Sequence, residues 1–340
     1  MNAMPFLDLI QPLLDQRNLD DVQAHALMSW LLDGEASEAQ IGAAITALKL
    51  KGVTPGELAS FALALRERAK KLELGPDVVD TCGTGGGRST FNISTAAAFV
   101  AAGAGIKIAK HGNRSVTSKC GSADVLESLG AKLQDDLIKL TNIFSEAGIV
   151  FMFAPVHHPG MRHVGKARKE LGFRSVFNQL GPLANPAGAK RQLIGVYDPS
   201  LIEPMAKALA QLGAERAVVV HGDDGLDEIS PCGPSKAGFV LNGEVRITSV
   251  APKDFGLASI SESALEPGED AAENATILQL AISELGSSRS KAILPSAAMA
   301  IWLSGKANDL EQARVMAEES IESGMAAEKL EQFIGACAKA

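Results

Sequence analysis

The chain has few aromatic side chains. They make up 4% of its 340 residues, with one tyrosine and two tryptophans. Surfaces that bind single-stranded nucleic acid stack bases on aromatic rings. The composition is therefore better suited to tightly packed helices and glycine-rich turns than to a base-stacking surface.

An excess of positive charge and long apolar runs are also lacking. The net charge is -8, which argues against a general partner such as nucleic acid or a membrane surface. No apolar stretch approaches the length of a membrane span. The first residues include Asp8 and no long apolar run, so we expect no signal peptide. We expect a cytoplasmic protein that binds neither nucleic acid nor membrane.

Cysteine is scarce as well. The four cysteines show no short pair spacing, which indicates neither a disulfide framework nor a zinc site. Cys82, Cys120 and Cys232 flank the polar loops described below. A nucleophilic cysteine needs a lowered pKa and a partner base, and the sequence points to neither. We interpret these three as small packing residues.

The first 72 residues read as helices only. Ser37 with Gln40, and Thr54 with Glu57, have the spacing of capping boxes, and Pro55 stands at a first helical position. We expect a helical domain over residues 1–72, used for packing and self-association, followed by a hinge at 73–77.

From residue 78 on, short apolar runs alternate with helical patterns. The expected strands are 78–81, 106–109, 149–154, 193–197 and 217–221, and the expected helices are 94–104, 123–129, 137–146 and 201–212. This alternation predicts an α/β fold with a mostly parallel central sheet covered by helices. Segments 239–241 and 245–248 flank Asn242-Gly243, which predicts a hairpin with a type I′ turn. Residues 270–338 return to helices.

Two polar loops directly follow expected strands. The first contains the glycines of 83–87, with Asn92, Ser94 and Thr95 at the start of the next helix. The second is the Lys-His-Gly-Asn-Arg segment at 110–114. Glycine lets backbone N–H groups approach an anion, and a helix N-terminus adds its positive dipole end. The alternatives are a plain chain reversal with a helix cap and a polar surface turn. Together the two loops favour a ligand with two anionic ends.

An acidic cluster at 223–228 follows the strand that ends at His221. Adjacent carboxylates suit Mg²⁺, which proteins hold with one or two carboxylates plus substrate phosphates. The alternative is a solvated acidic turn.

Three histidines stand close together in the segment 157–163. Their spacing matches no zinc motif, so we expect one of them, with Arg168 on the following helix, to face a substrate carboxylate. A basic helix face that covers acidic neighbours is the alternative.

These motifs together resemble the anthranilate phosphoribosyltransferase family. The resembling stretches are 83–95, 110–129, 153–186 and 221–230, and the overall layout agrees over essentially the whole chain. The resemblance implies a small helical domain, completed by a helical segment near 158–178, and a larger α/β domain over 78–340. It also implies a homodimer formed through the helical domain. The reaction implied is the transfer of the phosphoribosyl group of 5-phosphoribosyl 1-pyrophosphate (PRPP) to the amine of anthranilate, a step of tryptophan biosynthesis.

The same resemblance implies the site residues. Those expected at PRPP are Gly83, Gly86, Gly87, Arg88, Thr90, Asn92, Ser94, Thr95, Lys110, Arg114, Ser118 and Ala123. Those expected at anthranilate are Gly83, His111, Asn113, His158, Arg168, Gly181 and Pro182. Ser94, Asp227 and Glu228 are expected to serve two Mg²⁺ ions, and no residue is expected to act as a nucleophile or base.

The chain departs from the family in its first loop. That loop is one residue shorter, and Gly87 followed by Arg88 stands where the family has aspartate. We hypothesise that Arg88 contacts the pyrophosphate. Two rival interpretations remain: a pyrimidine nucleoside phosphorylase of the same fold, and a non-catalytic relative that binds nucleic acid.

Overall fold

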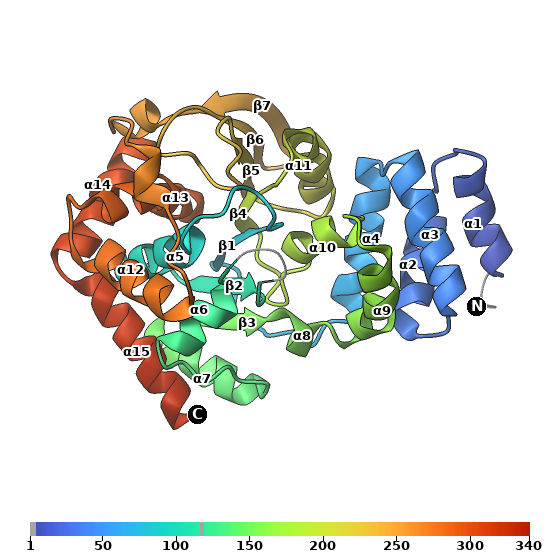
Figure 1. Cartoon of the computed structure of the whole chain (residues 1–340), viewed down its shortest axis with the longest axis horizontal. Coiled ribbons are helices and arrows are strands. Elements are labelled where there is room, and N and C mark those ends of the chain that lie inside the picture. The colour runs from blue at the N-terminus through green and yellow to red at the C-terminus, as the bar shows by residue number, and fades with distance from the viewer. Residues whose placement is uncertain (1–4, 116–118) are drawn as a thin grey trace.

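The computed structural model describes residues 5–115 and 119–340. Four helices come first: α1 (Phe6–Leu14), α2 (Asp21–Asp33), α3 (Glu38–Lys51) and α4 (Pro55–Glu67). Both predicted capping boxes are present, with Ser37 at the start of α3 and Thr54 at the start of α4. These helices lie side by side at one end of the molecule (Figure 1).

A seven-stranded sheet forms the centre of the larger part. Its strands are β1 (Val79–Gly83), β2 (Ile108–Gly112), β3 (Ile149–Phe153), β4 (Arg191–Gly195), β5 (Arg216–Gly222), β6 (Ser235–Leu241) and β7 (Glu244–Val250). They are arranged in the order β3-β2-β1-β4-β5-β6-β7. The first five are parallel and the last two are antiparallel, which confirms the predicted fold class. Asn242 and Gly243 both have positive φ, at 49° and 87°, as a type I′ turn between β6 and β7 requires.

Eleven helices accompany the sheet in the described part of the chain. They are α5 (Ile93–Gly103), α6 (Ser122–Ser128), α7 (Leu137–Ala147), α8 (Ala154–His157), α9 (Arg162–Leu171), α10 (Phe177–Leu183), α11 (Ile202–Gln211), α12 (Ala271–Ser283), α13 (Ser288–Ser304), α14 (Leu310–Glu322) and α15 (Met325–Lys339). Within the described ranges, no helix is long and apolar enough to cross a membrane.

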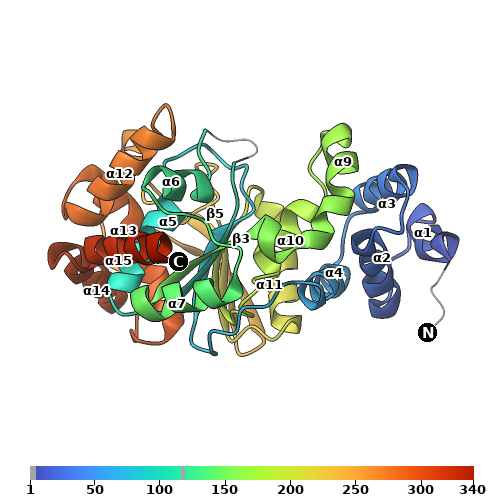
Figure 2. The same ribbon diagram turned by 90° about the horizontal axis from the view of Figure 1, so that it is seen from below.

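Alternate side chains of the strands enter different hydrophobic cores. On β5, Val218 and Val220 pack with α5 and α13, while Ala217 and Val219 pack with α10 and α11. The second core continues through α9 and α10 into α1–α4. Figure 2 shows this arrangement, with α5 and α12–α15 on one side of the sheet and α10 and α11 on the other.

Strand edges differ from the predicted ones by a few residues. The fourth strand was expected at 193–197 and is Arg191–Gly195, because Val196 and Tyr197 already belong to the connection after it. The first strand extends to Gly83, so the glycine loop begins as the strand ends.

Candidate functional site

The site lies where the strand order reverses. Strands β2 and β3 follow β1 on one side, and β4 and β5 follow on the other, so β1 and β4 flank the switch point. Open parallel sheets bind ligands beyond the carboxyl ends of such strands. Gly83 of β1 pairs with Gly195 of β4 at that edge, and the N–H of Thr84 donates to the Gly195 carbonyl at 2.8 Å.

The N-terminus of α5 faces this edge, and its capping residue Asn92 does not cap it. Asn92 stands at the capping position, but its side chain makes no capping hydrogen bond and its Nδ2 donates to the Cys120 carbonyl at 3.2 Å. Its Oδ1 and the hydroxyl of Thr95 are buried and have no hydrogen-bond partner among the described residues. A helix start with open polar groups is suited to an anion. The plain-cap alternative for Asn92 therefore does not describe this structure.

Lys110 is buried below the glycine loop. Its Nζ donates to the Thr81 carbonyl and lies 3.4 Å from the Ser94 hydroxyl. Burial lowers the pKa of Lys110, and the negative charges nearby, led by Asp80, oppose that effect. The lysine joins the ends of β1 and β2 to the start of α5.

Asp227 and Glu228 close the site from the β5 side. The Glu228 carboxylate accepts a hydrogen bond from the Ser94 N–H at 3.1 Å and from the Ser296 hydroxyl at 3.3 Å. Burial, and then the charge of Asp227, raise the pKa of Glu228 to about 7. Burial also raises the pKa of Asp227, although the N–H of Gly87 donates to its carboxylate.

These groups fit a Mg²⁺ site. The donors are the carboxylate oxygens of Asp227 and Glu228, the second of which accepts from the Ser94 N–H. Among the described residues no group of three histidines, cysteines or acidic residues could hold a metal by itself, so other donors would have to complete the coordination. Mg²⁺ is characteristically held by one or two carboxylates and completed by substrate phosphate and water. Burial and the charge of Asp227 raise the pKa of Glu228, and a bound cation would favour its charged form.

Glycine at position 87 is required by Asp227. A Cβ atom on Gly87 would lie 2.6 Å from Asp227 Oδ1 and 2.7 Å from its backbone nitrogen. The aspartate that the resemblance leads one to expect here would therefore have no room in this arrangement. The shorter loop brings its backbone directly against the carboxylate of the acidic cluster.

The loop arginines are paired with carboxylates. Arg88 forms an ion pair with Glu262 at 2.6 Å, and Arg114 pairs with Glu127 at 2.6 Å and Asp124 at 3.8 Å. The Arg88 N–H also donates to the Gly225 carbonyl at 2.9 Å.

A pair of buried histidines lies next to these loops. The rings of His111 and His158 are 5.1 Å apart in an edge-to-face arrangement. His111 Nδ1 lies 3.1 Å from the Gly181 carbonyl, which can only accept, so Nδ1 carries the proton and Nε2 is a free acceptor. That Nε2 is buried without a partner in the described structure, and His158, also buried, has the backbone of Ala184 as its neighbour. Burial lowers the pKa of both rings, to about 4 for His158. Both are neutral at pH 7.

The other predicted acceptor residues lie on α9, on α10 and after β2. Gly181 and Pro182 belong to α10, and the Pro182 carbonyl accepts from Gln192 at 2.9 Å. Arg168 on α9 is half-buried, with its guanidinium 5.3 Å from the centre of the Phe177 ring. Asn113 is exposed after β2, and its carbonyl accepts from the Ala123 N–H at 3.2 Å.

Two further donor residues were predicted, Thr90 and Ser118. The Thr90 hydroxyl donates to the neighbouring Phe91 carbonyl at 2.9 Å. Ser118 lies outside the described residues.

The structure places further residues at the site that the sequence did not indicate. Arg174 donates to the Gly86 carbonyl at 2.7 Å, and Tyr197 donates its N–H to the Thr84 hydroxyl at 3.0 Å. Ser296 of α13 bonds to Glu228. Only Arg174 had a signal, since it falls inside the resembling stretch 153–186.

The cysteines near the loops are not activated. Burial raises the pKa of Cys82 well above its usual value, and that of Cys120 to about 11. Burial raises the pKa of Cys232 as well. All three thiols are protonated at neutral pH, in agreement with a packing role.

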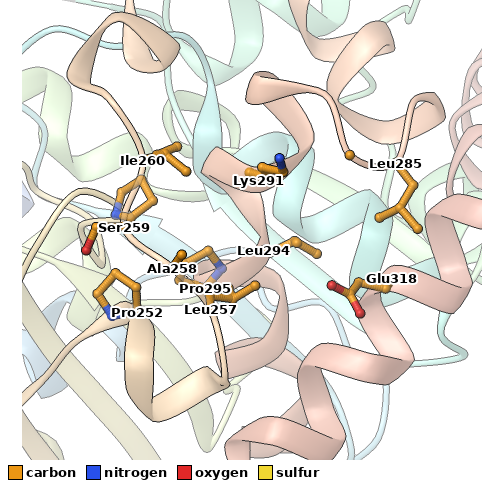
Figure 3. Close-up of a pocket in the computed structure, with 12 residues that line it drawn as sticks. Pro252, Leu257, Ala258, Ser259, Ile260, Leu285, Lys291, Leu294, Pro295 and Glu318 are labelled. Atoms are coloured by element: carbon orange, nitrogen blue, oxygen red, sulfur yellow. The ribbon is translucent and has the colours of Figure 1, made fainter.

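A separate cavity of about 260 Å³ is lined by residues of α13, of α14 and of the segment 252–260 (Figure 3). Pro252, Leu257, Leu294 and Pro295 line it, together with Lys291 and Glu318. None of the predicted site residues lines this cavity, so it is separate from the site at the strand ends.

Comparisons with known proteins agree with this geometry. Residues 75–327 match the model of the glycosyl transferase family, a/b domain, and residues 7–69 match the model of its helical bundle domain. An anthranilate phosphoribosyltransferase of Rubrobacter xylanophilus is 49% identical over 319 residues, which are 93% of each chain. The crystal structure of the Thermus thermophilus enzyme of that name is 38% identical, with a TM-score of 0.90 over 97% of this chain and 99% of its own. The Saccharomyces cerevisiae enzyme in complex with PRPP and Mg is 30% identical, with a TM-score of 0.89 over 98% of both chains. The chain belongs to the anthranilate phosphoribosyltransferase family.

Proposed function

We infer that this chain transfers the phosphoribosyl group of PRPP to the amine of anthranilate. The products are N-(5-phosphoribosyl)anthranilate and pyrophosphate, and the pathway is tryptophan biosynthesis. The observation that carries this inference is the junction of three features at one sheet edge: a helix N-terminus that its capping residue Asn92 leaves uncapped, a carboxylate pair and a pair of neutral buried histidines. Each matches one part of a reaction between a phosphorylated donor and an aromatic amine.

The donor is assigned to the loops after β1 and β2. Backbone N–H groups of the glycine loop and the start of α5 would bind phosphate, with Lys110 as the buried cation. The remaining polar groups are the Asn92 Oδ1 and the Thr95 hydroxyl, neither of which has a hydrogen-bond partner among the described residues. Gly83, Gly86, Gly87, Thr90, Arg114, Ser118 and Ala123 complete the proposed donor set.

Two Mg²⁺ ions per subunit are proposed, held by Ser94, Asp227 and Glu228. Bound Mg²⁺ stabilises the negative charge of the leaving pyrophosphate. Glu228 is fixed for this role by the Ser94 N–H and the Ser296 hydroxyl. Asp227 is fixed by the Gly87 N–H.

Anthranilate is assigned to the histidine pair and its surroundings. A neutral His111 with a free Nε2 can accept a hydrogen bond from the amine. Arg168, which has no carboxylate partner among the described residues, can pair with the anthranilate carboxylate. Gly83, Asn113, His158, Gly181 and Pro182 complete the proposed acceptor set.

The proposed mechanism is electrostatic. The C1′–O bond of the donor breaks through a cationic ribosyl state, and the amine attacks from the opposite face. The aromatic amine needs no strong base, so positioning of the two substrates supplies much of the rate. Closure of the two parts about residues 73–77 would exclude water during the reaction.

Arg88 is proposed to bind pyrophosphate by exchanging its partner Glu262 for the donor. We expect Arg88→Ala to raise the PRPP KM several-fold, measured in steady-state kinetics at saturating anthranilate. An unchanged PRPP KM would remove Arg88 from the donor site.

A homodimer formed through the helical part is proposed, and a cytoplasmic location. Large apolar side chains are exposed on α1–α4: Leu7, Leu14, Val22, Leu50 and Leu63. Exposed apolar residues on one part of a molecule are typical of an interaction surface. Sedimentation of the full chain measures the assembly, and a monomer at micromolar concentration would contradict it.

The first experiment follows anthranilate fluorescence with time after PRPP is added, with and without Mg²⁺. We expect a Mg²⁺-dependent loss of signal, which would also show that Gly87 is tolerated. Purified, folded protein that consumes no anthranilate would overturn the proposal. A parallel phosphorolysis assay with a pyrimidine nucleoside tests the nearest rival.

A further inference from the structure

Arg174 reaches the glycine loop from the other side of the site. It belongs to the connection between α9, which carries Arg168, and α10, which carries Gly181. Its Nη2 donates to the Gly86 carbonyl at 2.7 Å. The approach is close, because a Cβ atom on Gly86 would lie 2.6 Å from that nitrogen.

The guanidinium of Arg174 is held in place by Tyr197. The two groups stack with 4.2 Å between the guanidinium carbon and the ring centre. Tyr197 follows β4 and is tied to Thr84 of the glycine loop through its N–H. Arg174 is therefore fixed across the switch point of the sheet.

Arg174 differs from the other arginines at the loops in having no carboxylate partner in the described structure. Arg88 and Arg114 form ion pairs with carboxylates at 2.6 Å. For Arg174, no ion pair exists in the part of the chain that the structure describes, and its hydrogen-bond acceptor is a neutral carbonyl. A permanent, exposed cation without an ion pair in the described structure thus lies beside the loop, close enough for its charge to act on Asp227.

We propose that Arg174 binds the pyrophosphate of the donor, as a residue supplied by the segment that carries the acceptor site. Without the donor, the guanidinium donates its hydrogen bond to the Gly86 carbonyl. A phosphate oxygen is a stronger acceptor and would replace that carbonyl when the donor binds. This assignment rests on the proposed function. If it holds, the stretch from α9 to α10 contributes residues to both substrates: Arg174 to the donor, and Arg168 and Gly181 to the acceptor.

The test is calorimetric binding of inorganic pyrophosphate in the presence of Mg²⁺. Arg174→Gln keeps a donor for the Gly86 carbonyl and removes the charge, whereas Arg174→Lys keeps the charge. We expect pyrophosphate affinity about 30-fold weaker in Arg174→Gln and within about fivefold of the original in Arg174→Lys. If Arg174→Gln binds as well as the original chain, Arg174 serves only to hold the loop and the proposal is wrong.

Arg216→Gln is the matched control. Arg216 also stacks on an aromatic ring, Trp302, at 4.2 Å. It is the first residue of β5, however, and so lies at the amino end of that strand, away from the carboxyl ends that carry the site. Its removal should leave pyrophosphate affinity unchanged. An equal loss in Arg216→Gln would mean that any stacked arginine has this effect, and would overturn the assignment.

Kinetics separate this assignment from the proposed function. In Arg174→Gln, the PRPP KM should rise about as much as the pyrophosphate affinity falls, with the anthranilate KM unchanged. An increase in the anthranilate KM alone would place Arg174 at the acceptor and overturn the proposal. Pyrophosphate binding does not require anthranilate, so a charge-dependent loss of binding in a chain that consumes no anthranilate would support Arg174 while rejecting the proposed reaction.

Discussion

Two regions of the molecule each bury a lysine and a glutamate, and they do so differently. In the helical part, Lys51 and Glu57 are 2.8 Å apart, with side chains 3% and 0% exposed. At the strand ends, Lys110 is buried near Glu228, and the charge of each acts on the pKa of the other. In both regions, the removal of these charges from water is unfavourable.

The buried pair of the helical part is fully bonded. Glu57 also accepts from the Leu19 N–H and from both the N–H and the hydroxyl of Thr54, at 2.8 to 3.0 Å. Lys51 donates as well to Asn18 at 3.0 Å. These bonds tie the start of α4 to the connection before α2.

The strand-end cluster is not fully bonded. The buried Asn92 Oδ1, the Thr95 hydroxyl and the His111 Nε2 have no partner in the described structure, and the pKa of Glu228 is raised to about 7. Buried polar atoms are almost always paired, so a group of exceptions requires an explanation. The comparison teaches that a buried ion pair with all its bonds made holds the fold, whereas buried polar atoms left without partners mark where a ligand completes the structure.

Removal of the strand-end carboxylates should have the largest effect, and it should fall on activity. For Glu228→Gln and Asp227→Asn we expect kcat/KM to fall on the order of 10³, because transition-state charge is no longer stabilised. The thermal midpoint should be unchanged or higher, since a buried charge is removed. A large loss of stability with little loss of activity would break the comparison.

Removal of the carboxylate in the helical part should have the opposite signature. We expect Glu57→Gln to lower the free energy of unfolding by about 3–5 kcal/mol, because Lys51 stays buried without its partner charge. Chemical denaturation measures this change, and kcat of the folded fraction should change little.

Glu67→Gln provides the control for that loss. Glu67 forms an exposed pair with His25 at 2.8 Å, and such pairs contribute about 0–1 kcal/mol. Equal losses in the two variants would show that the burial of Lys51 and Glu57 is unimportant.

The pH dependence of stability sharpens the comparison further. The pKa of Glu228 is about 7 in the folded chain and 4.5 in its ordinary state, so the folded chain binds its proton more tightly. Its contribution to the free energy of unfolding is present below pH 4.5 and is lost as the pH rises to 7, by about 2–3 kcal/mol. His158, with a pKa lowered to about 4, has the opposite slope below pH 6.5.

The quantity to measure is therefore the difference in the free energy of unfolding between the original chain and Glu228→Gln, as a function of pH. We expect the original chain to lose stability relative to the variant between pH 4.5 and 7. A difference that does not vary with pH would mean that Glu228 titrates normally.

A methyl group at position 87 should have the smallest of these effects. Gly87→Ala places a carbon 2.6 Å from Asp227 Oδ1, so the loop must shift and PRPP affinity should fall about tenfold, as measured by its KM. Gly42→Ala is the control, because its Cβ meets nothing within 4 Å, and we expect it to stabilise α3 by about 0.5–1 kcal/mol. A Gly87→Ala chain with unchanged PRPP affinity would show that the loop adapts freely.

Local chemistry made much of the fold predictable. The Ser37 and Thr54 caps and the Asn242-Gly243 turn depend on residues close to one another in the sequence, and the structure has all three. The parallel sheet followed from the alternation of short apolar runs with helices. The ends of strands were less predictable, because they depend on neighbouring strands such as β1 beside β4.

The candidate site was predictable as a set of loops and not as a set of contacts. The three histidines of 157–163 look alike in the sequence, but His157 bonds to the Lys70 carbonyl, His158 faces His111 and His163 lies against Gly34. Their environments are set by segments that are distant in the sequence. The same holds for Arg174, whose contact with Gly86 spans 88 positions.

Gly195 lets the loop that carries the proposed metal carboxylates pack directly against the sheet. A Cβ atom on it would lie 1.7 Å from the Asp227 carbonyl oxygen, so the acidic loop rests directly on the backbone at the end of β4. With no side chain between them, the loop shares the rigidity of the middle of the sheet. Little conformational freedom is left to lose there when a cation arrives, so most of the ordering entropy has already been lost during folding.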